Sequence, residues 1–320
     1  MKGSIMKTHL RFLSVFFVLA FTVVLSAATT QSVYQSPQGA VNAFVAALRK
    51  NDLTKLVKVF GEGSEKLFVS EDKVADANTR KAFLELYAAK HKVISRDDGS
   101  GVLIVGKDQW PFPVPLVKID RGWMFDSPAG FEEIVNRRIG RNELDAIQTV
   151  LAIADAERDY YHQDRNGDGV LEYAQKFRST EGQHDGLYWK VNKNEALSPL
   201  GAFVAYAADE GYNEASTSYH GYNYRLISSQ GPHAQGGEYD YMVRSNQIGG
   251  FAIVAYPAAY GETGVMTFIM NHSGLMYQRD LGATTKELAL AINTFDPDAN
   301  WQKISERDMQ PLPPDPDTGD

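Results

Sequence analysis

The feature that most limits how this chain can fold is a charged helical stretch in its middle, which runs directly into an acidic loop containing glycine. Residues 132–161 carry apolar side chains at helical spacing, so one stripe can face a core while charged side chains such as Asp145 face water. Gly140 interrupts the pattern, and Asn142 is a suitable N-cap residue. We therefore expect two central helices that meet near Gly140 and separate two unlike halves of the chain.

The loop after this stretch has much of the spacing of a calcium-binding EF-hand loop. Oxygen-bearing side chains occupy its first, third, fifth and ninth positions, namely Asp164, Asn166, Asp168 and Glu172. The twelfth position, where a bidentate glutamate is expected, is the uncharged Gln175. In the competing interpretation, the Asn-Gly and Asp-Gly pairs only form tight turns whose side chains bond the local backbone. Ca²⁺ is thus the one cofactor that the sequence suggests, and a plain turn is the alternative.

The first 28 residues have the organisation of a secretory signal peptide. Lys2, Lys7 and Arg11 precede an apolar run over residues 12–25, and small residues up to Ala28 offer a cleavage site. The run is shorter than the roughly twenty residues that a membrane-spanning helix needs. We therefore expect cleavage near Ala28, no stable membrane span afterwards, and a periplasmic or secreted protein.

Charge and cysteine content exclude several classes of function. The formal net charge is −8 over 320 residues, which argues against nucleic acid as a partner because phosphate binding needs a basic surface. The chain has no cysteine, which removes cysteine nucleophiles, cysteine metal ligands and thiol redox chemistry. The length suggests about two domains. We expect one over residues 33–130, a second with the central helices over 131–305, and a disordered tail rich in proline and aspartate over 306–320.

The first half predicts helices followed by strands. Ser36 and Pro37 are an N-cap and a first helical residue, a second helix begins near Asp52, and strands are expected over residues 102–105, 113–119 and 122–125. The stretch SPQGAVNAFVAALRKNDLTKLVKVFG and the closing GWMFD resemble the nuclear transport factor two-like domains. That resemblance implies a cone-shaped α+β domain. The fold hosts both enzymes and non-catalytic modules, so it assigns no function.

The second half predicts a long helix packed on a four-stranded antiparallel sheet. A helix opened by Ser198 should end at Gly211, and a last helix over residues 288–295 follows a capping box. The four expected strands lie between glycine-rich turns, at residues 239–243, 251–256, 265–270 and 275–278. The stretches AIQTVLAIADAERDYY, GDGVLEYA and FAIVAYPAAYGETGVMTFIMNHSG resemble the globular heads of type IV pilins and pseudopilins. Since the apolar stem of those proteins is not attached to this half, the resemblance implies a borrowed head and not a fibre subunit.

A third resemblance covers the whole chain. RRIGRNELDAI, DGLYW, SPLG, HGYNYRLISSQG and YPAAYGETGVMTF are similar to sequences of the domain of unknown function 2950 family of exported bacterial proteins. This resemblance implies export and a shared fold, and it names no substrate.

A run rich in tyrosine and glycine, residues 219–238, is the strongest candidate for ligand recognition. Tyrosine combines a stacking face with a polar tip, which suits a glycan or an extended peptide. The candidate contact residues are Tyr219, His220, Tyr222, Tyr224, Gln230 and His233. In the competing interpretation, the glycines only turn the chain between a helix and a sheet.

No short motif identifies a reaction. The sequence contains neither H-E-x-x-H nor G-x-S-x-G, so catalytic residues would have to be assembled by folding, and the weak candidates are His184, His220 and Glu238. Our leading interpretation is a non-catalytic binding or assembly module of the cell envelope, with an envelope protein or a glycan as partner. The alternative is a periplasmic hydrolase of a cell-wall or glycan substrate, with its site between the domains.

Overall fold

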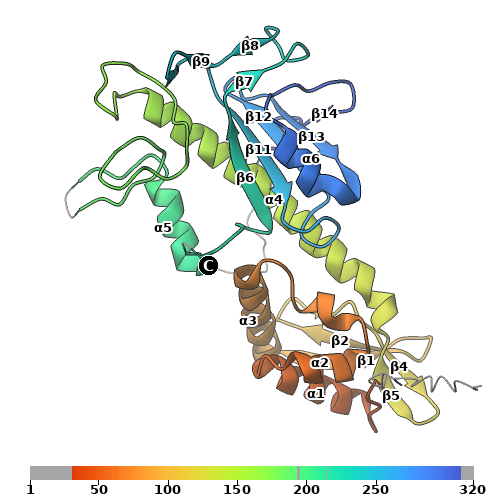
Figure 1. Ribbon diagram of the computed structural model, residues 1–320. Helices are drawn as coiled ribbons and strands as arrows, with labels where there is room; N and C mark the ends of the chain where they lie inside the picture. The colour runs from red at the N-terminus through yellow and green to blue at the C-terminus, as the bar shows by residue number, and fades with distance from the viewer. Residues whose placement is uncertain (1–30, 193–194, 214, 311–320) are drawn as a thin grey trace, which may run out of the picture.

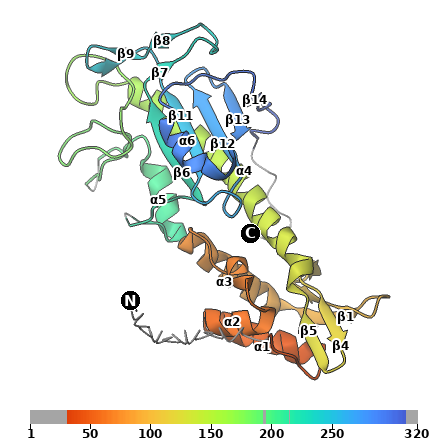
Figure 2. The same ribbon diagram turned by 45° about the vertical axis from the view of Figure 1, so that its right-hand side comes forward.

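The protein has an α+β fold of two lobes joined by one long helix (Figures 1 and 2). The computed structural model describes residues 31–192, 195–213 and 215–310. The predicted signal peptide and the last ten residues of the predicted tail lie outside this part. Within it, none of the helices combines the length and the hydropathy that a membrane crossing requires.

Three helices and a five-stranded antiparallel sheet build the N-terminal lobe. The helices are α1 (Pro37–Arg49), α2 (Leu53–Phe60) and α3 (Lys73–Ala89), and the short 3-10 helix η1 (Ser64–Leu67) lies between the last two. The strands are β1 (His91–Ser95), β2 (Gly101–Val105), β3 (Trp110–Pro111), β4 (Leu116–Ile119) and β5 (Gly122–Phe125). Their order is β1-β2-β4-β5, and β3 pairs with β2.

The local signals of this lobe explain its first elements. Ser36 caps α1, as predicted, and Asp52 caps α2, which begins where it was expected; both side chains accept hydrogen bonds from backbone N–H groups. The apolar faces of both helices enclose a phenylalanine cluster in which Phe60 stacks on Phe125 with ring centroids 4.5 Å apart. Helix α3 and strand β1 were not predicted, because α3 buries only one of its seventeen side chains, Tyr87, and so shows no clear apolar stripe.

Helix α4 (Ser127–Tyr161) corrects the prediction of two central helices. It runs through Gly140 without a break, and a Cβ at that position would meet no atom within 4 Å. Asn142 does not cap a helix start. It is buried, and its side-chain amide donates to the carbonyl of Thr263. The helix packs against η1 at one end and against the C-terminal sheet at the other, so it belongs to both lobes (Figure 2).

The C-terminal sheet has five antiparallel strands instead of the predicted four. Their order is β14-β13-β12-β11-β6. The bounds are β6 (Tyr222–Ile227), β11 (Ala252–Pro257), β12 (Met266–Asn271), β13 (Met276–Asp280) and β14 (Gln302–Lys303). Three strands match the prediction within two residues at either end. The predicted strand over residues 239–243 is not in this sheet, and β6 lies within the run that the sequence assigned to a recognition loop.

Both faces of this sheet are covered, which explains why β11 is an uninterrupted apolar run. Ile253 and Ala255 pack with α4, whereas Ala252, Val254 and Tyr256 pack with α6 (Thr285–Ala291) and the segment after it. Successive strand residues point to opposite faces, so a strand buried on both sides shows no polar alternation. Helix α6 has no side-chain cap, so the predicted capping box does not form, and the helix ends at Ala291.

The remaining elements lie at the ends of the C-terminal lobe. Helix α5 (Gly201–Glu210) ends at Gly211, whose φ of 107° is left-handed, as predicted. Four two-residue strands form two small ribbons: β7 (Ser229–Gln230), β8 (Tyr239–Asp240), β9 (Met242–Val243) and β10 (Asn246–Gln247). Residues 306–310, the described part of the predicted tail, form turns, and Met309 packs on the core beside α4.

Candidate functional site

A buried carboxylate, Asp72, joins the two lobes. Its Oδ1 caps α3 by accepting from the N–H groups of Val74 and Ala75. Its Oδ2 accepts from the Tyr212 hydroxyl and from the Gly221 N–H, each at 2.8 Å, and both residues belong to the C-terminal half. One carboxylate therefore satisfies four donors, two in the first turn of α3 and two about 140–150 residues further along the chain.

His220 lies next to this junction, between two further carboxylates. Its Nδ1 is 2.9 Å from Asp145 Oδ2 on α4, and its Nε2 is 3.1 Å from Glu210 Oε2 on α5. The backbone of His220 is left-handed, with a φ of 48°. The next residue must be glycine, because a Cβ on Gly221 would lie 2.5 Å from Asn142 Nδ2.

The charges around His220 favour its protonated form. Burial lowers the pKa of His220, but the hydrogen bond and charge of Asp145 and the charge of Glu210 outweigh burial, so the pKa lies above its ordinary value. Both ring nitrogens then donate to carboxylates, and neither is free to accept a proton. The Tyr219 hydroxyl also donates to Glu210 Oε2, and the pKa of this tyrosine is raised by burial and by that carboxylate. The cluster holds charge in place, and its imidazole cannot accept a proton while both nitrogens donate to carboxylates.

The structure does not bring the three weak catalytic candidates together. His184 stacks on Trp189 with ring centroids 4.3 Å apart, and Glu238 lies in the loop between β7 and β8. Among the described residues, no hydrogen bond, ion pair or ring contact joins either of them to His220. Only His220 lies at the interdomain position that the hydrolase alternative requires.

The six residues of the predicted recognition loop also separate. Tyr222 and Gln230 are fully buried; the Tyr222 hydroxyl donates to the carbonyl of Met266, and Gln230 accepts from Tyr241. Tyr224 belongs to β6, and Tyr219 and His220 belong to the junction described above. His233 is exposed and contacts Asp296 at 3.0 Å. These side chains hold the fold together and do not share one exposed surface.

The acidic loop uses its carboxylates within the chain. Both Asp164 oxygens accept backbone N–H groups, from Gly167 and Gly169. One Asp168 oxygen accepts the Val170 N–H and the other accepts from Asn246. Glu172 is buried, and its oxygens accept from Asn166 and from the Gln247 backbone. Within the described segments, no group of three histidine or acidic residues has the arrangement of a metal site. This geometry fits the turn interpretation, and calcium binding stays a prediction.

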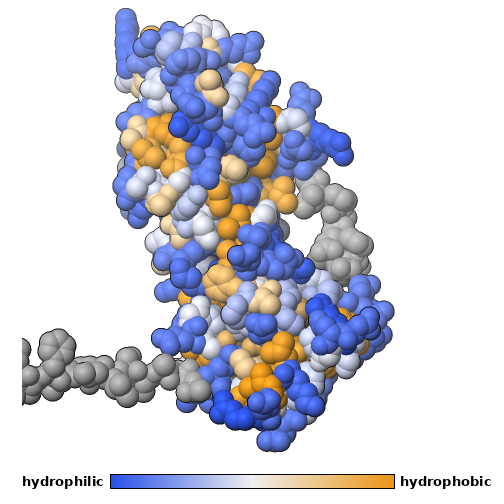
Figure 3. Space-filling model, turned by 90° about the vertical axis from the view of Figure 1, so that its right-hand side faces the viewer, coloured by the Kyte–Doolittle hydropathy of each residue, from blue (hydrophilic) through white to orange (hydrophobic). Residues whose placement is uncertain are grey.

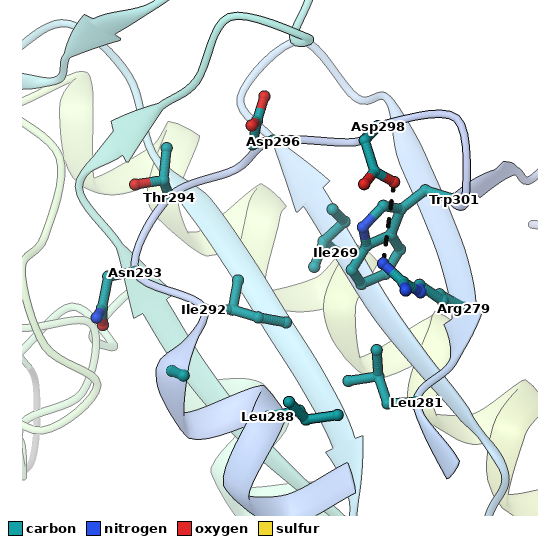
Figure 4. A pocket seen from close by; sticks show the side chains of 11 residues that line it. Ile269, Arg279, Leu281, Leu288, Ile292, Asn293, Thr294, Asp296, Asp298 and Trp301 are labelled. Atoms are coloured by element: carbon teal, nitrogen blue, oxygen red, sulfur yellow. Dashed lines mark ion pairs between the residues drawn. The ribbon is translucent and has the colours of Figure 1, made fainter.

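A ligand-sized pocket opens on the sheet face that α6 covers. Its volume is about 410 Å³, and it lies between α6, β13 and the segment that follows α6 (Figure 4). We call it the α6 pocket. Its apolar lining consists of Ile269, Leu281, Leu288, Ala291, Ile292 and Trp301. Its polar lining consists of Arg279, Asn293, Thr294, Asp296 and Asp298.

No pattern in the sequence indicates the α6 pocket. Leu288 was predicted only as the first residue of the last helix, and its half-exposed side chain lines the pocket. Trp301 lies beyond the last predicted element. The partners of His220 were equally hidden, since Asp145 was expected to face water and Glu210 lay at the end of a separate helix. A histidine flanked by tyrosine and glycine was the only local clue to the junction.

The comparisons with known proteins assign a family. Residues 31–304 match the family described as Protein of unknown function (DUF2950), and the chain belongs to this family. No curated protein and no solved structure matches the chain.

Proposed function

We propose that this protein is an exported, non-catalytic binding or assembly module of the cell envelope. The observation that carries the proposal is the α6 pocket. Its volume of about 410 Å³ lies within the range of roughly 300–1,000 Å³ that is usual for ligand sites. Apolar side chains form its interior and charged side chains stand beside them, which is the usual composition of a recognition site.

The chemistry of the pocket favours binding over catalysis. Asp296 and Asp298 are the two carboxylates that line it, so they are the pair that a glycosidase mechanism would use. A general acid in such a pair needs a raised pKa. Hydrogen bonds from the Asn300 backbone and side chain instead lower the pKa of Asp298. Asp296 accepts hydrogen bonds from the backbone N–H and the ring of His233, so its carboxylate already serves as an acceptor within the chain.

Exposed apolar side chains elsewhere also support the proposal that this protein binds a partner. Among the described residues, five of the eleven exposed large apolar side chains lie in two neighbouring segments, the acidic loop and the small ribbons over residues 239–248: Val170, Leu171, Tyr239, Val243 and Ile248. The Asn246 side chain donates to Asp168, and the Tyr173 N–H donates to the Gln247 carbonyl, so these segments touch. On the face in Figure 3, apolar side chains reach the surface in patches among hydrophilic ones. Such patches often mark interaction sites.

The resemblances of the two halves fit this proposal. We propose that the N-terminal lobe is a nuclear transport factor two-like domain, since α1 and α2 pack on β5 and α3 packs on β1 and β2. We propose that the C-terminal lobe is a pilin-like head, since α4 lies along an antiparallel sheet. Experimental structures of the separate lobes would refute either assignment if they failed to superpose on members of those families.

A hydrolase is the second candidate, because His220 lies at the lobe junction with carboxylates at both ring nitrogens. The test is turnover by the purified chain from residue 29 to 320. We expect no release of soluble fragments from purified cell walls or of reducing ends from soluble glycans. We also expect the same blank result for His220→Ala. Turnover by the wild type that His220→Ala abolishes would overturn the binding proposal and establish the hydrolase.

A further inference from the structure

We propose that the α6 pocket binds a segment of a partner protein, in which an apolar side chain enters the pocket and a neighbouring lysine or arginine meets its carboxylates. This inference rests on the proposed binding function and names the chemistry of its ligand. It concerns one surface, formed by α6, the end of β13 and the segment from residue 292 to 301 (Figure 4).

The interior of the pocket suits an apolar side chain. Five of its six apolar lining residues are aliphatic, and branched side chains from Leu281, Leu288 and Ile292 face the same hollow (Figure 4). Aliphatic surfaces of this kind bury another aliphatic or aromatic side chain well. Burying one such side chain away from water favours binding. Anchors of this kind dominate the free energy of many protein interfaces.

The polar lining argues against a sugar as the ligand. All five polar side chains already have partners within the chain. Arg279 pairs with Asp298 at 3.9 Å, and Asp296 contacts His233. The Asn293 side chain accepts from Arg225, and Thr294 contacts the Ser229 hydroxyl. A neutral ligand rich in hydroxyl groups would have to compete with these contacts for its hydrogen bonds, whereas a cation is attracted by the charge of the carboxylates without displacing them.

The charge of the lining points to a cation beside the apolar anchor. Two carboxylates and one guanidinium line the pocket, so the lining is acidic on balance. The Arg279–Asp298 pair is long at 3.9 Å and exposed, so Asp298 can accept a second cation. The whole chain is also acidic, with a formal net charge of −8. Complementary charge of this kind selects partners and speeds their association.

The test is a peptide titration followed by the indole N–H signals of the ¹⁵N-labelled protein. Trp301 is one of four tryptophans, and its signal is assigned from the spectrum of Trp301→Phe. The probe is the acetylated and amidated hexapeptide GKLLKG. Its controls are GKSSKG, which lacks the anchor, and GELLEG, which reverses the charge. We expect GKLLKG to shift the Trp301 signal in a saturable way and both controls to bind at least tenfold more weakly.

Helix α6 supplies a matched pair of variants. Leu288 and Leu290 are 46% and 47% exposed, but only Leu288 lines the pocket. Leu288→Asp should weaken GKLLKG binding at least tenfold, which corresponds to losing about 1.4 kcal/mol of apolar contact. Leu290→Asp should leave the affinity within about twofold. Similar melting temperatures of the two variants show that both fold.

Three outcomes would overturn the proposal. The first is no shift of Trp301 with GKLLKG, and the second is equal weakening by the two leucine variants. The third is a Leu288-dependent shift with hexa-N-acetylchitohexaose but not with GKLLKG. That third result would replace the peptide by a glycan and leave the binding function standing. Failure of the binding function itself is detected separately, by the turnover assay described above.

Discussion

At the scale of single residues, buried carboxylates stabilise this fold only when they have enough donors. Asp72 receives four hydrogen bonds and connects both lobes. Glu157 on α4 is as deeply buried, but it receives one, from the Ala174 N–H to its Oε2. Its Oε1 has no partner within the described part of the chain. An acid left partly unsatisfied in a core is costly to ionise.

Glu157 therefore makes stability depend on pH. Burial raises its pKa well above the usual range, so the folded state holds a proton that the unfolded state releases above about pH 4.5. The folded state binds more protons, so this group lowers stability as pH rises. Glu157→Gln keeps the acceptor for Ala174. We expect the free energy of unfolding of the variant, relative to that of the wild type, to increase by more than about 1 kcal/mol from pH 4 to pH 8.

Urea unfolding at both pH values measures this difference. If the difference in the free energy of unfolding stays constant, or favours the wild type at pH 8, then Glu157 ionises normally in the folded protein.

At the scale of elements, the continuous helix α4 is the main departure from the sequence prediction. Glycine at position 140 lowers helix propensity by about 1 kcal/mol relative to alanine, which is too little to break a helix whose two ends are packed on separate lobes. A glycine indicates only a local preference against helix. The packing on either side of Gly140 decides whether the helix continues.

Two glycines of α4 test this account. Gly140→Ala should stabilise the protein by about 0.5–1 kcal/mol, because the new Cβ meets open space in a helix interior. Gly130→Ala should destabilise it by about 1–3 kcal/mol, because its Cβ would lie 2.7 Å from Val114 Cα. Chemical denaturation of both variants measures the effects. Destabilisation by Gly140→Ala would mean that the helix is broken there.

The other elements show which structures could be predicted from signals within their own segment of the sequence. Helices α1 and α2 and strands β11 and β12 were predictable, because caps and apolar runs lie within each segment. Strand β6 was missed because it is an edge strand with polar residues, YNYRLI, between glycine-rich turns. His220 was named from the sequence, but its partners were missed for a different reason. His220 and Asp145 are 75 residues apart in the sequence, and no spacing rule connects residues that only the folded chain brings together.

The acidic loop yields a prediction about metal dependence. Asp168 accepts hydrogen bonds from the Val170 N–H and from Asn246, so it joins two segments by direct hydrogen bonds. We expect Asp168→Ala to lower the melting temperature equally in Ca²⁺ and in chelator. A larger loss in Ca²⁺ would establish the calcium site, because a ligand that binds only the folded state adds stability in proportion to its binding.

At the scale of the whole molecule, the lobe junction should respond to pH through His220. Its pKa is raised, so the imidazolium between Asp145 and Glu210 stabilises the fold fully below about pH 6.5. That contribution is lost as pH rises through the folded pKa. The hydroxyl groups of Tyr212 and Tyr219, which also face the junction, stay protonated in this range because their pKa values are raised.

His220→Gln provides the measurement. The wild type should exceed the variant in melting temperature at pH 5.5, and this gap should shrink by pH 8.5. The contribution of Glu157 is common to both proteins and cancels in the difference. A gap that widens with pH would show that His220 is neutral in the folded protein.

We propose that this chain acts by binding a partner protein through the α6 pocket. A photoreactive phenylalanine analogue at position 288, or at the equally exposed position 290, in the organism that encodes the chain tests this binding in place. We expect a discrete protein adduct from position 288 only, with the attachment site beside a lysine or arginine in an apolar segment. No adduct at position 288, or the same adducts from both positions, would show that the pocket does not bind such a partner.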